Sequence, residues 1–127
     1  MIARDTNIIP GKHVADWTGQ EGKFVETAAG ADSIVNNAAD IPLGVITEGL
    51  PTNSAIATPK FSGTVKVKVT GTSPGTIVRG TYLTVKSDGT VQADAGTGAR
   101  VRVARALEAG AANELIEAYL LEPTALA

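Results

Sequence analysis

Few side chains in this 127-residue sequence are of a type and at a spacing that could do chemistry. There is no cysteine, which excludes thiolate chemistry and zinc–thiolate sites, and the single histidine is His13 beside Lys12. A lone His13 could be a ligand or a general base, but a metal needs several ligands and a base needs a partner that holds the substrate. The acidic residues are dispersed, with Asp88 and Asp94 in turn-like surroundings, and nothing indicates a carboxylate pair for glycoside hydrolysis. We predict no catalytic residue, no metal site and no cofactor, and a protein that is not an enzyme.

Two glycine-containing stretches and two lysines are the next candidates for binding. Residues 71–76 lack the lysine of a P-loop, and residues 96–100 carry two glycines of a dinucleotide fingerprint but lead into a strand-like run instead of a helix. We interpret both stretches as loops. Lys66 and Lys68 lie within an alternating run, whereas a lysine that carries lipoyl or biotin normally sits at a tight turn. We therefore expect both lysines to face solvent.

Arg100, Arg102 and Arg105 follow one another closely and could contact phosphate or an acidic partner. Because no aromatic residues are interleaved and the formal net charge is −2, nucleic acid is not an expected partner. We expect a solvated face or a contact with another subunit, with salt bridges across an assembly. No apolar stretch of about 18 residues exists, and residues 1–6 lack the apolar region of a signal peptide. We expect no membrane association and a protein that acts where it is made.

Short β-branched runs separated by glycine dominate the chain. In residues 63–71 three valines alternate with Lys66 and Lys68, which gives one dry and one wet face. Similar runs recur about every ten residues: 23–27, 33–36, 43–47, 54–58, 61–70, 82–86, 90–92 and 100–106. Fourteen glycines and six prolines fit such a turn-rich chain. The sequence predicts an all-β single domain, a small barrel or sandwich.

The two ends of the chain leave alternatives open. Residues 104–122 are rich in helix formers, but Gly110 and Asn113 interrupt them, so we predict a hairpin with helix as the alternative. Pro123 is expected to end the element in either case. We expect residues 1–21 to form an extended arm that lies on a neighbour, ahead of a domain over residues 22–127; the alternative is a first edge strand.

The order of several motifs resembles a known family. Residues 42–46 read Pro-Leu-Gly-Val-Ile, residues 63–67 place a glycine before an apolar strand, and residues 80–83 are followed by Ser-Asp-Gly-Thr-Val at 87–91. Residues 104–117 contain Ala-Leu-Glu followed by Glu-Leu-Ile. This pattern resembles the small capsid decoration, or cement, proteins of tailed bacteriophages, over about the C-terminal two-thirds of the chain.

The resemblance implies a small β-barrel or β-tulip-like module on the outer surface of the expanded phage head, made in the host cytoplasm. Such proteins clamp neighbouring major capsid subunits and usually form homo-oligomers, with trimers favoured. Ile8, Ile9, Pro10 and Trp17 are our candidates for an arm that contacts the capsid, because an extended segment can add a strand to a neighbour's sheet edge. The alternatives are a tail, baseplate or fibre module of a virion, or a carbohydrate-binding module. A sugar site would need aromatic platforms, and the chain has only five aromatic residues.

Overall fold

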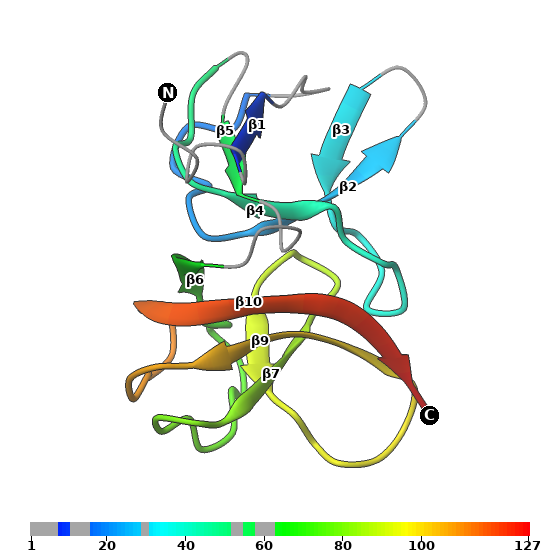
Figure 1. Cartoon of the computed structure of the whole chain (residues 1–127), viewed down its shortest axis with the longest axis vertical. Coiled ribbons are helices and arrows are strands. Elements are labelled where there is room, and N and C mark those ends of the chain that lie inside the picture. The colour runs from blue at the N-terminus through cyan, green and yellow to red at the C-terminus, as the bar shows by residue number, and fades with distance from the viewer. Residues whose placement is uncertain (1–7, 11–15, 29–30, 52–54, 58–62) are drawn as a thin grey trace.

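The computed structural model describes residues 8–10, 16–28, 31–51, 55–57 and 63–127, which form strands and turns and no helix (Figure 1). This confirms the all-β prediction. The upper sheet of Figure 1 has the strand order β1-β5-β4-β2-β3 and the lower sheet the order β6-β10-β9-β7-β8. The upper strands are β1 (Ile8–Pro10), β2 (Phe24–Ala28), β3 (Ala31–Ile34), β4 (Gly44–Ile46) and β5 (Ala55–Ala57). The lower strands are β6 (Thr64–Lys68), β7 (Tyr82–Val85), β8 (Val91–Ala93), β9 (Arg100–Ala106) and β10 (Leu115–Leu126).

The lower sheet curls strongly but does not close into a barrel. All of its strand pairs are antiparallel. Its two edge strands, β6 and β8, approach each other at one parallel bridge between Val69 and Val91, where the Thr70 N–H donates to the Val91 carbonyl at 2.9 Å. One bridge is not a ladder, so the molecule is a pair of packed sheets. No described segment forms a helix that is long and apolar enough to cross a membrane.

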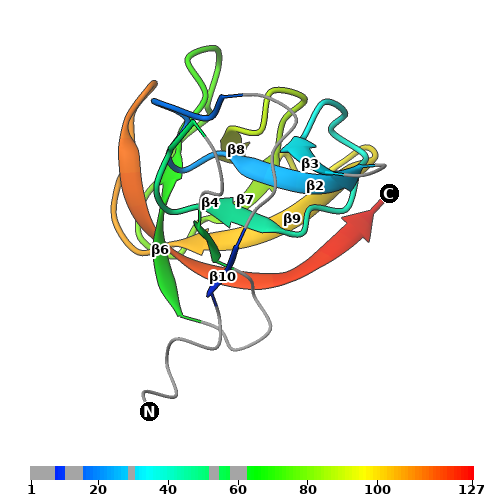
Figure 2. The same ribbon diagram turned by 90° about the horizontal axis from the view of Figure 1, so that it is seen from above.

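The alternation along the strands places apolar side chains on both faces of the upper sheet. Phe24 and Val45 face the lower sheet and join the larger core cluster between the two sheets. Val25 and Ile46, the next residues along each strand, belong to a second cluster that includes Trp17. Figure 2 shows the upper sheet lying over the lower one, with β2 and β4 crossing above β7 and β9. The upper sheet is therefore covered by the lower sheet on one face and by Trp17 on the other.

Two glycines connect the sheets through backbone hydrogen bonds. The Phe24 N–H donates to the Gly89 carbonyl at 2.8 Å, and the Lys68 N–H donates to the Gly22 carbonyl at 2.9 Å. Both glycines have a positive φ, +84° at Gly22 and +83° at Gly89, which other residues adopt only with strain. A Cβ at Gly89 would also lie 2.8 Å from the Ile34 Cγ2 atom. The turn that contains Asp88, whose turn-like surroundings are recognisable in the sequence, thus also fixes the lower sheet against the upper one.

The C-terminal hairpin is confirmed, and the predicted end at Pro123 is wrong. β9 and β10 pair antiparallel, and Asn113 takes a φ of +69° in the turn between them. β10 runs on through Pro123 to Leu126, with a register shift between Leu120 and Thr124. Pro123 fits because it lies in this irregular stretch, beyond Tyr119, the last residue of β10 that pairs with β6 within the described part of the chain.

A candidate protein-interaction face

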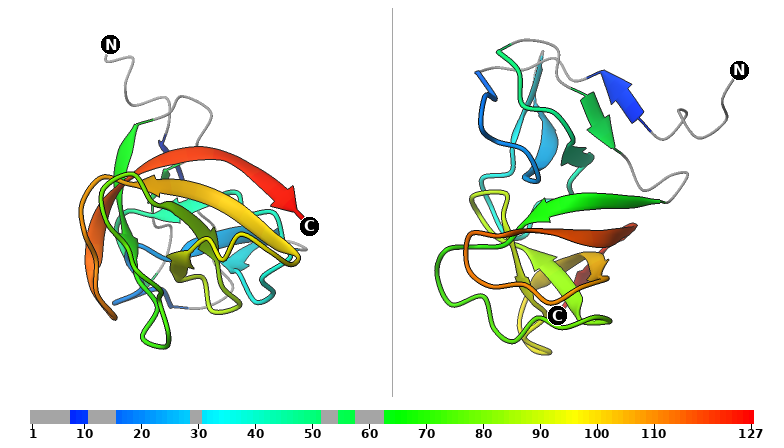
Figure 3. Two further views of the ribbon diagram at one scale, coloured as in Figure 1. Left: turned by 90° about the horizontal axis from the view of Figure 1, so that it is seen from below. Right: turned by 90° about the vertical axis from the view of Figure 1, so that its left-hand side faces the viewer.

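The predicted arm divides into a strand and a core residue. Ile8, Ile9 and Pro10 form β1, an edge strand whose backbone pairs with β5 in the register Ile8↔Ala57 (Figure 3). This matches the alternative of a first edge strand. Trp17 is only 1% exposed in the second core cluster, so as the chain is folded here its side chain offers no surface to a partner. His13 and two parts of the predicted arm, residues 1–7 and 11–15, lie outside the described residues.

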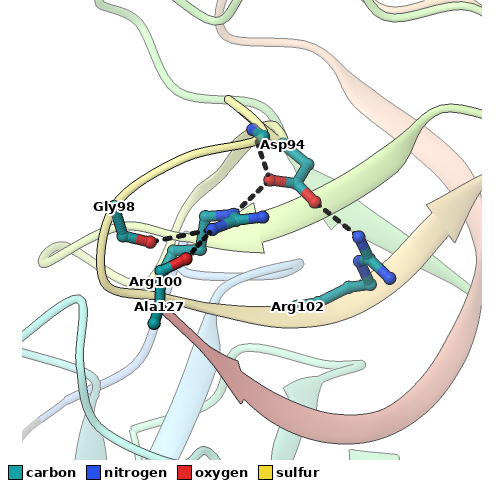
Figure 4. A network of polar contacts seen from close by, with 6 residues as sticks. Asp94, Gly98, Arg100, Arg102 and Ala127 are labelled. Atoms are coloured by element: carbon teal, nitrogen blue, oxygen red, sulfur yellow. Dashed lines mark hydrogen bonds and ion pairs between the residues drawn. The ribbon is translucent and has the colours of Figure 1, made fainter.

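The predicted arginine row is also divided, because two of its members share ion pairs with the Asp94 carboxylate (Figure 4). The Asp94 carboxylate accepts hydrogen bonds from the Arg100 Nε atom, from the Arg102 Nη2 atom at 2.7 Å and from the Gly96 N–H at 2.9 Å. Its side chain is 10% exposed. Burial alone would raise the pKa of Asp94, but the Arg102, Gly96 and Arg100 donors outweigh it and lower the pKa to about 2.

This network has a structural role. The Arg100 Nη1 atom also donates to the Gly98 carbonyl at 2.8 Å and to the Ala127 backbone oxygen at 3.1 Å. One guanidinium therefore ties the loop between β8 and β9 to the end of β10, as the dashed lines of Figure 4 show. Because its charge is matched by Asp94, it contributes little to binding a charged partner.

Arg105 has a different environment, on the outer face of the lower sheet. It pairs with Tyr119 of β10 on one side and with Tyr82 of β7 on the other, so the three residues form one row across three strands. Tyr82 is 38% and Tyr119 40% exposed. The Arg105 Cζ atom lies 5.0 Å from the centroid of the Tyr82 ring and the Arg102 Cζ atom 4.1 Å from it, both within the range of cation–π attraction.

A second arginine lies beside this row. Arg79, in the loop before β7, and Arg105 line a surface depression of about 330 Å³ together with Gly80, Ala106, Leu107 and Tyr119. The Arg79 Nη1 atom donates to the Leu107 carbonyl at 2.9 Å, and the Arg105 Nε atom donates to the Gly80 carbonyl at 3.0 Å. We call Arg79, Tyr82, Arg105 and Tyr119 the arginine–tyrosine face.

A neighbouring charged cluster, formed by Lys66 of β6, Glu117 of β10 and Glu108 after β9, has the opposite balance of charge. Lys66 lies 3.7 Å from a Glu117 carboxylate oxygen and 3.8 Å from one of Glu108, and all three side chains are at least two-fifths exposed. Such exposed ion pairs contribute little to stability. They do set a boundary, because two carboxylates around one lysine end the positive charge of the arginine–tyrosine face.

Sequence reasoning missed three of the four residues of this face. Tyr119 could have been assigned to the outer surface, because it alternates with the buried Ala118 and Leu120 on β10. Tyr82 precedes the buried Leu83 in the same way. No local sequence pattern indicates that Arg79 belongs to this face. Arg79 lies in a loop, and its hydrogen-bond acceptor, Leu107, is 28 residues later in the sequence.

Comparisons with known proteins do not assign the chain to a family. No protein-family model matches the chain, and a search of curated proteins finds no significant match. Among the described residues there is no group of three or more His, Asp or Glu side chains placed to hold a metal ion.

Proposed function

We propose that this protein is a structural virion protein that binds the outside of a tailed-phage head and clamps neighbouring major capsid subunits. The motif order in residues 42–117 suggests the family and hence the partner. The arginine–tyrosine face is the structural observation that supports binding to a protein. Tyrosine and arginine are enriched in protein–protein interfaces and among the residues that contribute most to binding. Here they are presented on a sheet, with the arginines held by hydrogen bonds.

A clamp needs a second contact, and β1 is suited to provide it. β1 has β5 on one side and no further strand on the other in the described sheet. An edge strand of this kind can pair with an extended segment of a neighbour. β1 belongs to the upper sheet and the arginine–tyrosine face to the lower one, so one copy could touch two subunits (Figure 3). In a homo-oligomer, for which we favour a trimer, linked contacts strengthen one another through their effective concentration.

The first test is the copy ratio of this protein to the major capsid subunit in purified particles. A ratio near one to one supports a place on the head lattice. A ratio of a few per hundred would instead favour the tail, baseplate or fibre, and absence from the particles would refute a virion role. Heads prepared without the protein are expected to lose DNA at a lower temperature and to regain stability when it is added back. Heads that are equally stable without it would count against the clamp.

The carbohydrate-binding alternative loses support at Tyr82. A sugar would need to stack on an open aromatic face, and two guanidinium groups already lie against this ring. Trp17 and Phe24 are both buried in the core. Binding to a glycan array that disappears on Tyr119→Ala would restore this alternative.

A further inference from the structure

Arg79 and Arg105 are exposed arginines that are not in an ion pair with any carboxylate of the described residues. Each donates one hydrogen bond to a backbone carbonyl and keeps further N–H donors for another acceptor. This separates them from Arg100 and Arg102, which both form ion pairs with the Asp94 carboxylate. The depression between them and Tyr119 therefore carries two positive charges without an internal counterion in the described chain.

We propose that this depression binds a carboxylate side chain, Asp or Glu, from an acidic surface segment of the partner protein. The inference rests on the proposed function, in which that partner is the major capsid subunit. A guanidinium matches a carboxylate geometrically, because its parallel N–H groups can donate to both oxygens. Ala106, Leu107 and the Tyr119 ring give the depression apolar walls that would exclude water from such a pair.

The hydrogen bonds of the two arginines prepare the site for binding. Arg79 reaches across to Leu107, which follows β9, while Arg105 of β9 reaches back to Gly80, beside Arg79. The two side chains thus hold each other's segments, and the Tyr82 ring restrains Arg105 further. A partner that meets restrained guanidinium groups loses less side-chain entropy on binding than one that meets freely rotating arginines.

The surroundings favour a protein segment over nucleic acid. A nucleic-acid backbone requires a continuous positive track, and this one is interrupted on both sides. On one side the Asp94 carboxylate forms ion pairs with Arg100 and Arg102, and on the other Glu108 and Glu117 surround Lys66. The exposed apolar side chain of Val78 precedes Arg79 in the chain, and apolar area beside positive charge is expected at a protein interface.

The main experiment measures binding to heads that lack the protein, by co-sedimentation at roughly physiological salt. The variants are Arg79→Gln, Arg105→Gln and the double variant. Lys86→Gln is the control, because it removes one positive charge from a lysine whose amine bonds the Thr72 carbonyl, away from the depression. Hydrogen bonds to charged groups imply a loss of about 10-fold to 100-fold in affinity for each arginine. The control is expected to stay within about threefold of wild type.

The outcomes separate this inference from the proposed function. If wild type does not bind heads, the proposed function fails. If wild type binds and the double variant binds equally well, the function stands and the carboxylate site is overturned. Melting midpoints check that the variants fold. Should Arg105→Gln unfold the chain, Arg79→Gln still tests the site, because Arg79 makes only the hydrogen bond to Leu107 within the described residues.

Two further measurements test the identity of the ligand. A blocked triglutamate peptide is expected to shift the NMR signals of the Arg79 and Arg105 side chains, and an oligothymidine of similar charge is expected to shift them less. A stronger response to oligothymidine, lost in the double variant, would overturn the inference in favour of nucleic acid. Sedimentation velocity tests whether a second copy of this chain occupies the depression instead. A change of oligomeric state in the double variant would mean that it does.

Discussion

Asp94→Asn is the substitution whose effect is best defined by the structure. The wild-type carboxylate accepts three hydrogen bonds and forms ion pairs with Arg100 and Arg102, so its removal leaves two guanidinium groups facing a neutral amide. The amide oxygen can still accept from one of them, so the local backbone is expected to keep its shape. The variant therefore tests the contribution of the charge and not of the loop.

The magnitude follows from the lowered pKa. A fall from 3.8 to about 2 corresponds to about 2 kcal/mol in the free energy of unfolding. Because the Arg102 side chain is 31% exposed and solvent screens the pair, we expect about 1–2 kcal/mol. The folded-state pKa is depressed, so this contribution is fully present above 3.8 and is lost as the pH falls to about 2. The variant has no ionisable group here and lacks this pH-dependent part.

Urea denaturation of both proteins at a series of pH values from neutral to about 2 measures the difference. We expect Asp94→Asn to be less stable by about 1–2 kcal/mol at neutral pH, a shift of roughly 3–8 °C in Tm, and the gap to close at the acid end. Glu122→Gln is the matched control, because the side chain of Glu122 is exposed. A gap that stays constant with pH would refute the electrostatic explanation and would mean that loop packing is the cause.

Other substitutions test the packing and the remaining titration. Gly89→Ala is expected to lower the free energy of unfolding, measured by urea denaturation, by about 3 kcal/mol, and Gly96→Ala by only about 1–2 kcal/mol. Both glycines have a positive φ, but an added Cβ would meet neighbouring atoms only at Gly89. Equal losses would contradict the role of Gly89 in joining the sheets. Burial and the hydrogen bond with Asp40 raise the pKa of Glu26 above 4.5, so its charge destabilises the fold at neutral pH. Glu26→Gln is therefore expected to raise Tm at pH 7, with a gain that shrinks as the pH falls toward 4.5 and is absent below it. A lower Tm at pH 7 would contradict this reasoning. Trp17→Ala is expected to cost about 3–5 kcal/mol in the same denaturation assay, whereas a surface residue of an arm would cost almost nothing.

Strand positions could be predicted from the sequence wherever alternation was regular. Along β6 the buried Val67 and the exposed Lys66 follow the alternation of apolar and charged residues in the sequence. The C-terminal hairpin could be predicted against the helix propensity of its residues because Gly110 and Asn113 interrupt them. In the structure Asn113 takes a left-handed conformation and Gly110 forms a bridge with Ile77, where a Cβ would lie 2.9 Å from the Ile116 Cγ2 atom. Both interruptions are therefore required by the fold.

Long-range packing could not be predicted in this way. Trp17 lies in a polar-looking segment, and nothing local indicates that the upper sheet has an apolar outer face for it to cover. Pro123 was expected to end a strand on local grounds, but the neighbouring strand β6 has already ended at that point. In both cases the structure depends on a contact with residues that are remote in sequence. Local propensity and residue spacing therefore cannot predict it.

The arginine row illustrates the same limit at the candidate site. Arg100 and Arg102 are two residues apart along β9, whereas Arg105 is three residues after Arg102. Strict alternation would therefore place Arg105 on the opposite face of the sheet from Arg100 and Arg102. The register shift between β7 and β9, with Val103 and Ala104 both buried, inserts an extra residue and brings Arg105 to the outer face. Pairing then separates the roles. Asp94, six and eight residues before its two partners, forms ion pairs with Arg100 and Arg102, while Arg105 lines the depression with Arg79 from a distant loop. The arginines that remain for a partner are those that the fold leaves without a carboxylate, and only the strand register determines which they are.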